Sequence, residues 1–255
     1  MVLCLDIGNT TSHWGLVDSE GPGRNGSWET TRMATHLPVL LSSLRNGGEP
    51  PEALAFSSVA PRATETLESV LSVADWGAPV FQLTSKTCRG LELCIDVPSE
   101  LGADRIAAAV GVQSLYRLPA IVIDMGTAVT VDAVTARGYM GGVIAPGLAI
   151  MTRYLHEQTA LLPELDPGDL ETESGLGRNT LDQMKIGCRV GFGGMVERLV
   201  ERIESDLHAR GEAPASIVAT GGSVPVLLPE LRSRLHVEPH LLLRGLHEAW
   251  RRNRG

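Results

Sequence analysis

Aromatic residues are scarce in this sequence of 255 residues, which has three Phe, three Tyr and four Trp. Proteins that bind single-stranded nucleic acid use aromatic side chains as stacking platforms, so the composition argues against such a surface. Positive charge is also in deficit: 22 Lys and Arg residues stand against 30 Asp and Glu, a formal net charge of −8. Because phosphate backbones demand clustered Lys and Arg, we expect no nucleic-acid partner.

Cysteine and long apolar runs are equally limited. The four cysteines, at positions 4, 88, 94 and 188, form no Cys-x-x-Cys pair and no zinc spacing, which predicts reduced thiols rather than a disulfide framework. The uncharged stretch from Gly138 to Thr152 contains five Gly or Pro residues and is too short to span a bilayer. The N-terminus has no basic region typical of a signal peptide. We therefore expect a soluble, cytoplasmic protein that has no membrane partner.

An internal repeat is the main organising feature. Hydrophobic residues make up 43% of the chain and charged residues 20%, a globular composition. Residues 2–17 and 120–134 share one plan: an apolar strand, an Asp, a glycine turn with Thr, and a second strand. Asp6 and Asp124 lie close to half a chain length apart. The repeat predicts a duplicated α/β domain, with one domain over residues 1–117 and the other over 118–255.

Hydrophobic periodicity and turn residues predict the remaining elements. Ser99 is the expected N-cap of a central helix. The acidic segment 163–173 is expected to be a solvated loop. The basic segment 251–255 is expected to be an exposed tail. The expected strands cover residues 2–6, 12–17, 27–33, 53–59, 79–83, two segments within 120–134, 138–144 and 216–219. The expected helices cover 37–45, 62–74, 99–116, 147–161 and 179–209, followed by two closing helices.

The first candidate site is the turn from Asp6 to Thr11, with the sequence Asp-Ile-Gly-Asn-Thr-Thr. A strand that enters such a turn can direct backbone N–H groups and hydroxyls at a phosphate. Asp6 at the strand end is placed to hold Mg²⁺, directly or through water, because Mg²⁺ prefers carboxylate and water oxygens. An ordinary hairpin turn would use the same residue types, and for this segment alone it is the favoured interpretation.

Two further turns shift the preference from an ordinary hairpin turn to a phosphate-binding turn. Asp124 to Thr130 repeats the first motif in the second half, and two matching turns could grip a polyphosphate. Ala219-Thr220-Gly221-Gly222 follows an apolar strand, and its glycines would let a base or ribose approach the backbone. A plain strand-to-helix turn is the alternative for this third segment. Together the three turns favour nucleotide binding.

A fourth motif, Gly102-Ala103-Asp104-Arg105, opens a predicted helix. An Asp there is often only a favourable partner of the helix dipole. Beside two nucleotide turns, however, the carboxylate could accept a hydroxyl proton and the guanidinium could hold an anion.

These motifs in this order resemble the type III pantothenate kinase family. The resemblance rests on DIGNT (6–10), SSVAP (57–61), GADR (102–105), DMGTAVTVD (124–132), GYMGGVIAPGL (138–148), GRNT (177–180) and ATGG (219–222). It implies two ribonuclease-H-like halves of the actin and sugar-kinase ATPase superfamily, with ATP in the cleft between them. It also implies ATP-dependent phosphorylation of pantothenate to 4'-phosphopantothenate, the first step of coenzyme A biosynthesis.

The resemblance also implies residue roles. Asp104 would be the catalytic proton acceptor, Asp124 would bind a monovalent cation (K⁺ or NH₄⁺), and Thr180 would reach the substrate of the neighbouring subunit in a homodimer. With the turns above, the expected ATP-binding residues are Asp6, Ile7, Gly8, Asn9, Thr10, Thr11, Ser12, His13, Thr127, Gly221 and Gly222. The expected substrate-binding residues are Ile95, Gly102, Ala103, Asp104, Arg105 and Thr180.

Two positions depart from the family pattern. Ile95 stands where the family usually has Tyr, and Ala108 stands where it commonly has Asn. Ile95 removes a hydroxyl that could bond to substrate, which puts substrate affinity in question more than the chemistry. Two alternatives stay open: a non-catalytic relative that acts as a regulatory accessory factor, and a kinase of another small hydroxyl compound.

Overall fold

The computed structural model describes residues 1–47, 50–172, 174–226, 231 and 233–254. The chain forms two compact units. The first comprises Met1–Tyr116, Arg137–Tyr139 and His240–Gly255, and the second comprises Arg117–Ala136 and Met140–Pro239. The sequence-based division at residue 117 differs from this partition at the C-terminal end, since residues 240–255 belong to the first unit.

A five-stranded sheet with the order β3-β2-β1-β4-β5 forms the first unit. The central strand β1 pairs antiparallel with its hairpin partner β2 on one side and parallel with β4 on the other. Because side chains alternate along a strand, Leu3, Leu5 and Ile7 point into one core and Asp6 lies on the opposite face. The strands are β1 (Val2–Ile7), β2 (Thr11–Val17), β3 (Pro22–Glu29), β4 (Leu54–Ser58) and β5 (Val80–Gln82).

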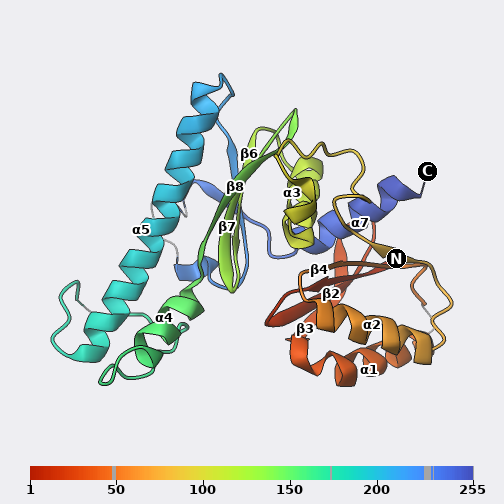
Figure 1. The fold of residues 1–255 in the computed structure, drawn as a ribbon, viewed down its shortest axis with the longest axis horizontal. Helices are drawn as coiled ribbons and strands as arrows, with labels where there is room; N and C mark the ends of the chain where they lie inside the picture. The colour runs from red at the N-terminus through yellow and green to blue at the C-terminus, as the bar shows by residue number, and fades with distance from the viewer. Residues whose placement is uncertain (48–49, 173, 227–230, 232, 255) are drawn as a thin grey trace. The chain divides into compact units, whose positions relative to one another are not determined.

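Helices cover both faces of this sheet (Figure 1). α1 (Met33–Asn46) and α2 (Pro61–Val73) cover the face with Leu3 and Leu5, while α3 (Ala103–Leu115) and α7 (Leu241–Asn253) cover the face with Asp6. Ser99 is not the N-cap of α3: residues Pro98–Glu100 form a separate 3-10 turn, Leu101 is extended, and Gly102 takes the cap position. The expected helix therefore begins four residues later than the sequence pattern indicated.

The helix α7 joins the first unit because it packs directly on α3. A Cβ at Gly245 would collide with the backbone of Ala107, and one at Gly111 would lie 2.6 Å from the carbonyl oxygen of Leu241. Only glycine permits this close approach of the two helices. The basic C-terminal end is also not a free tail, because Arg252 donates to Glu248 (2.8 Å) and to Oε1 of Gln113 (2.8 Å).

The second unit repeats the plan of the first. Its sheet has the order β10-β9-β6-β7-β8, and β6 again lies antiparallel to its hairpin partner β7 and parallel to β9. This repeated order confirms the predicted duplicated α/β architecture. The strands are β6 (Ala120–Met125), β7 (Ala128–Thr135), β8 (Gly138–Pro146), β9 (Ser216–Thr220) and β10 (Leu235–Val237).

One of the two expected closing helices is α7; the other falls in the segment between β9 and α7, part of which lies outside the described residues. The segment after β9 contains a 3-10 turn, η3 (Val224–Val226), and the strand β10, which the sequence pattern did not indicate. Residues 227–230 and 232 of that segment lie outside the described residues.

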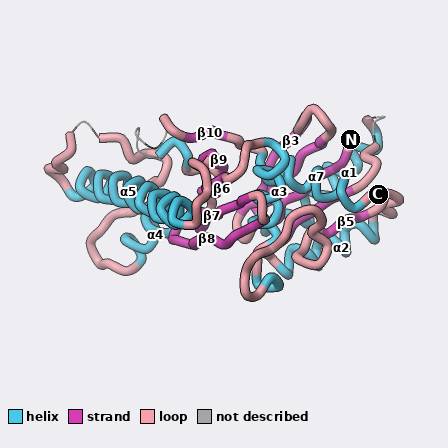
Figure 2. Tube along the Cα trace, turned by 90° about the horizontal axis from the view of Figure 1, so that it is seen from above, coloured by secondary structure: helices cyan, strands magenta, loops and turns pink. Residues whose placement is uncertain are grey.

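Two helices pack on the second sheet, α4 (Leu148–Glu157) and the 30-residue α5 (Thr180–Ala209) (Figures 1 and 2). The core between α5 and the sheet includes Met184, Val196 and Val200. Segment 163–173 is not merely a solvated loop, because Leu165 and Leu170 are buried in the same core. Among the described residues, no helix combines the length and apolarity needed to cross a membrane.

Candidate functional site

Two carboxylates mark the candidate site of the first unit. Asp6 lies near the end of β1, where it is paired in register with Ser57 of β4, and both side chains are buried. The Ser57 hydroxyl donates to Oδ1 of Asp6 at 2.7 Å. Asp104, at the N-terminus of α3, is close enough for its charge to act on Asp6. The structure therefore brings together the two acids that the sequence placed in different motifs.

Burial raises the pKa of Asp6 from 3.8 to about 7. The negative charge of Asp104 pushes this pKa in the same direction, while the hydrogen bond from Ser57 lowers it. A carboxyl with such a pKa is poised to gain from a nearby cation, since a positive charge would favour its ionised form.

The motif Gly102 to Arg105 forms the first turn of α3. A side chain at Gly102 would collide with Oδ1 of Asp104, so glycine lets the carboxylate turn back over the helix start. The same Oδ1 accepts a 2.7 Å hydrogen bond from the backbone N–H of Arg105. The Arg105 guanidinium lies 5.8 Å from the centroid of the Tyr139 ring, in cation–π range. These contacts fix both charged groups of the motif.

The two departures from the family pattern occupy different environments. Ile95 is half-buried in the segment before α3. Ala108 is 2% exposed and lies within the packed part of α3. The substitution at 108 therefore concerns the packing of α3, whereas the substitution at 95 concerns a surface that solvent reaches.

The first glycine turn is narrow. The N–H of Gly8 donates to the carbonyl of Thr11 at 3.1 Å, and a Cβ on Gly8 would lie 2.8 Å from that oxygen. Asn9 and Thr10 are exposed at the tip. Two predicted ATP-binding side chains point elsewhere, because those of Ile7 and Ser12 are fully buried. Any contact of those two residues with a nucleotide would fall to their backbones. His13 is exposed on β2.

The second glycine turn lies in the second unit. Asp124 precedes it near the end of β6 and is half-buried, while Thr127 is exposed. A Cβ on Gly147 would collide with the carbonyl oxygen of Thr127, and one on Gly221 would lie 2.6 Å from the backbone of Met125. Gly221 also has a φ of +96°, which favours glycine. The predicted turns at 124–130 and 219–222 are thus brought together, and Gly222 has open space around it.

Thr180 is exposed at the first position of α5, remote in sequence from these turns. Its predecessor Asn179 caps the helix: its side chain accepts from the N–H of Asp182 at 2.9 Å and donates to the Asp182 carboxylate at 2.7 Å. This cap fixes where Thr180 begins the helix.

The chemistry of these donors fits a divalent cation in the first unit. Asp6 offers a buried carboxylate whose ionised form is disfavoured by burial and by the charge of Asp104, and Mg²⁺ beside Asp6 would offset both effects. In the described part of the chain, no three His, Cys, Asp or Glu residues cluster as a metal site, so the substrate phosphates and water would have to complete the coordination. In the second unit, Asp124 offers one carboxylate to a cation.

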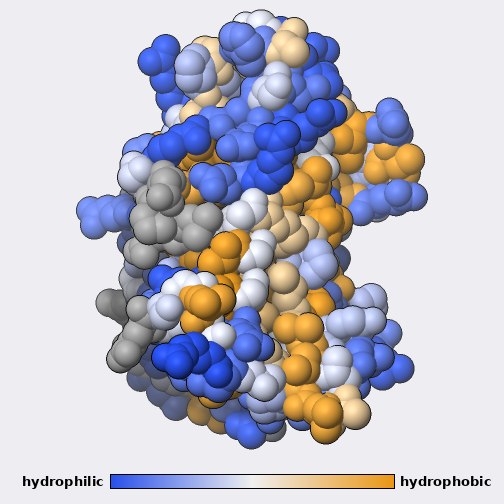
Figure 3. All heavy atoms as spheres, turned by 90° about the vertical axis from the view of Figure 1, so that its left-hand side faces the viewer, coloured by the Kyte–Doolittle hydropathy of each residue, from blue (hydrophilic) through white to orange (hydrophobic). Residues whose placement is uncertain are grey.

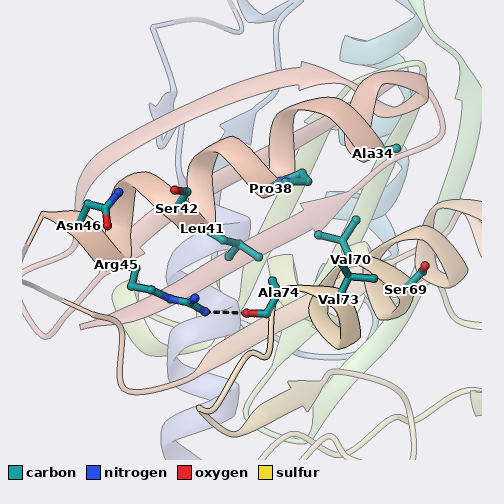
Figure 4. Close-up of a pocket in the computed structure, with 10 residues that line it drawn as sticks. All are labelled: Ala34, Pro38, Leu41, Ser42, Arg45, Asn46, Ser69, Val70, Val73 and Ala74. Carbon is teal, nitrogen blue, oxygen red and sulfur yellow. Dashed lines mark hydrogen bonds between the residues drawn. The ribbon is translucent and has the colours of Figure 1, made fainter.

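A separate cavity of about 530 Å³ lies between α1 and α2 (Figure 4). Apolar residues including Leu41 and Val70 line it, and at one end Arg45 donates to the carbonyl of Ala74 at 2.7 Å. None of the candidate site residues contributes to its lining.

Sequence reasoning missed three residues that contact the candidate site: Ser57, Thr30 and Tyr139. Ser57 and Tyr139 lie in segments that the family resemblance singled out, so their motifs were a usable signal. Thr30 lies in the segment 27–33 that the sequence pattern predicted as a strand, but nothing in that pattern linked it to the turn. Its hydrogen bonds to Gly8 and Thr10 in the structure identify it.

The repeated sheets, each with an acid and a tight glycine turn after its central strand, define the α/β fold of the actin and sugar-kinase ATPase superfamily. Two solved structures show this likeness of fold. A Baf family protein from Campylobacter jejuni has a TM-score of 0.62 at 18% identity, covering 99% of this chain and 98% of that one. Lmo2764 from Listeria monocytogenes, a candidate N-acetylmannosamine kinase, has a TM-score of 0.54 at 13% identity, covering 98% of each chain.

Sequence comparison narrows the assignment. The family profile of type III pantothenate kinase matches residues 2–202. A type III pantothenate kinase of Streptomyces coelicolor is 35% identical, covering 99% of this chain and 98% of its own. One of Geobacter sulfurreducens is 34% identical over the full length of both. The chain belongs to the type III pantothenate kinase family.

Proposed function

We propose that this protein transfers the γ-phosphoryl group of ATP to the primary hydroxyl of pantothenate, the reaction that opens coenzyme A biosynthesis. The observation that carries the proposal is the pair Asp6 and Asp104: a buried strand-end acid and a helix-start acid close enough to act on each other. The full-length similarity to pantothenate kinases supports the choice of substrate.

Asp104 is the proposed proton acceptor. Phosphoryl transfer depends mainly on positioning and on neutralising charge, with a base that orients the attacking hydroxyl. The N–H of Arg105 holds one carboxylate oxygen of Asp104, which fixes the direction of the group. Arg105, steadied by the Tyr139 ring, would hold the pantothenate carboxylate. Gly102, Ala103 and Ile95 complete the proposed substrate surface.

ATP is proposed to contact both glycine turns, through residues 6–13 in the first unit and through Thr127, Gly221 and Gly222 in the second. Asp6 would hold Mg²⁺, directly or through water, and the ion would neutralise phosphate charge. Asp124 would hold a monovalent cation, K⁺ or NH₄⁺, beside the phosphates. The carboxylate chemistry of each position supports these assignments.

We also propose a cytoplasmic homodimer in which Thr180 of one subunit reaches the pantothenate site of the other. The buried apolar side chains of α5 do not supply this interface, because Met184, Val196 and Val200 pack inside their own unit. The support comes from other side chains. The exposed apolar residues of this unit include Ile144, Leu161, Leu176, Leu181 and Val190. Figure 3 shows apolar surface on the side of the molecule that α5 faces.

Glycines on α5 add a second argument for the dimer. Gly187, Gly191 and Gly194 follow one another at helical spacing, and a Cβ at each would meet open space. A glycine inside a helix costs about 1 kcal/mol relative to alanine, and no atom of the described residues comes close enough to these three to exclude a side chain. Close approach of a second α5 would account for them.

A coupled assay of ADP release tests the proposed function. Purified protein with Mg·ATP in potassium buffer is measured without acceptor, with pantothenate, and with a panel of other small alcohols. Release that depends on pantothenate is expected. Release that depends instead on another alcohol would reassign the substrate, and no release with any acceptor would contradict the proposal.

A further inference from the structure

Thr30 contacts the first glycine turn twice. Its hydroxyl donates to the carbonyl of Gly8 at 2.7 Å, and its backbone N–H donates to the carbonyl of Thr10 at 2.8 Å. It immediately follows β3, which pairs with β2 on the far side of the hairpin. One residue therefore holds both ends of the turn tip, on either side of Asn9.

A third bond completes a chain of hydroxyls. The Thr30 and Ser12 hydroxyl oxygens lie 3.0 Å apart. Because a hydroxyl has a single proton and that of Thr30 goes to Gly8, the Ser12 hydroxyl must be the donor in this pair. Ser12 is fully buried and Thr30 is 8% exposed, so water does not replace these bonds readily and each is costly to remove.

The chain holds backbone atoms of the turn and leaves its tip open. Gly8 and Thr10 give their carbonyl oxygens to Thr30, which turns those acceptors away from a bound anion. Asn9 between them is exposed and has no hydrogen-bond partner within the part of the chain that the structure describes. Its N–H and its amide side chain are available to a ligand.

We propose that Thr30 is a positioning residue for nucleotide binding: it fixes the turn Gly8–Thr11 so that the tip presents donors, not carbonyl acceptors, to the phosphates of ATP. The inference rests on the proposed function only for the identity of the ligand as ATP. Thr30 touches neither substrate nor the reacting atoms in this account. Its contribution is to remove conformational freedom from the turn before the nucleotide arrives.

Calorimetric titration with Mg·ATP tests the inference without any phosphoryl acceptor. Thr30→Val keeps the shape but removes the hydroxyl, and we expect affinity to fall about tenfold, because the released turn would occupy its binding-competent conformation only about a tenth of the time. Thr30→Ser retains the hydroxyl and should bind close to wild type. In kinetics, Thr30→Val should raise KM for ATP and leave KM for pantothenate unchanged.

Thr87→Val is the matched control, because Thr87 in the same unit also donates to a carbonyl at 2.7 Å, that of Gln82. It should retain wild-type affinity for ATP. If Thr30→Val fails to fold, Ser12→Ala, which removes only the donor to Thr30, should still weaken binding about twofold to threefold.

Wild-type affinity in a folded Thr30→Val protein, or equal losses in Thr30→Val and Thr87→Val, would overturn the inference. Failure of the proposed function has a different signature: wild-type protein would bind ATP but form no phosphopantothenate, and the affinity comparison would still decide the role of Thr30. A wild-type protein that binds no ATP would overturn both.

Discussion

The Ser57 hydroxyl donates a 2.7 Å hydrogen bond to Oδ1 of Asp6, from the residue paired with Asp6 on the neighbouring parallel strand. This bond lowers the pKa of the buried carboxyl, but burial and the charge of Asp104 outweigh it and raise that pKa to about 7. The ionised form of Asp6 therefore destabilises the folded protein. A cation that binds there would recover this free energy, which is the expected signature of a functional carboxylate.

Replacing Asp6 with Asn should therefore stabilise the unliganded protein above neutral pH. The unfolded chain loses the Asp6 proton near pH 3.8, and the folded chain retains it to about pH 7. The unfolded state binds fewer protons between these values, so wild-type stability falls as pH rises through this window and the loss is constant above it. Asp6→Asn avoids this loss, so its free energy of unfolding above pH 7 should exceed that of wild type by at most on the order of 4 kcal/mol.

Urea unfolding of both proteins at pH 4, 6 and 8 measures this. The advantage of Asp6→Asn should be largest at pH 8 and should vanish near pH 4. Asp96→Asn, at an exposed loop position, serves as the control for the effect of an Asp-to-Asn substitution itself. An Asp6→Asn advantage that is equal at all three pH values would contradict the account of Asp6.

Much of the fold and of the candidate site could be predicted from the sequence, because both depend on local patterns that occur twice in the chain. Both hairpins and both glycine turns follow from an apolar run, an Asp and a glycine. The strand β3 was missed in its first half, since Pro22, Gly23 and Gly26 are typical of loops; pairing with β2 determines its conformation.

Contacts between distant segments could not be predicted. The fit of Gly245 against α3 assigns the last helix to the first unit, and no local pattern contains that information. The apolar positions of α5 were correctly placed on a helix, but periodicity does not say which surface covers them. They pack in the core of their own unit.

Replacing Asp104 with Asn should abolish most of the turnover. The amide preserves shape but cannot accept the hydroxyl proton, and general base catalysis is worth about 10²–10⁴-fold in rate. Steady-state kinetics with ATP and pantothenate measure the loss. Glu100→Gln, which changes an exposed acid four residues earlier, is the control and should keep wild-type turnover. Wild-type turnover in Asp104→Asn as well would show that Asp104 is not the base.

Exchange of potassium for sodium at constant ionic strength tests Asp124. If Asp124 holds a monovalent cation beside the phosphates, turnover should be higher in potassium than in sodium. The difference should disappear in Asp124→Asn, because that variant lacks the charged ligand. Equal rates of the wild-type protein in both salts would count against the cation assignment.

A bulky side chain in place of a glycine on α5 tests the proposed dimer. Gly191→Leu places a side chain in open space within the subunit, so it should not harm the fold of an isolated chain, but it should separate two closely packed α5 helices. Light scattering should report a dimer for wild type and a monomer for Gly191→Leu. Ser205→Leu, exposed farther along the helix, should remain dimeric. A wild-type monomer with full activity would refute the assembly.

Mixed subunits test the role of Thr180 in that assembly. Asp104→Asn and Thr180→Trp should each be inactive alone, because each spoils both pockets of its homodimer. After mixing and subunit exchange, one pocket of each hybrid would have both residues intact, and activity should return in part. No recovery, once exchange has been verified, would mean that Thr180 does not act across the interface.

The most direct test of the central claim is mass-spectrometric detection of the product. Wild-type protein, Mg·ATP and pantothenate in potassium buffer should yield phosphopantothenate, formed in equal amount to ADP, and the Asp104→Asn protein should yield almost none over the same time. Absence of phosphopantothenate with the wild-type protein, while ATP binding is intact, would contradict the account.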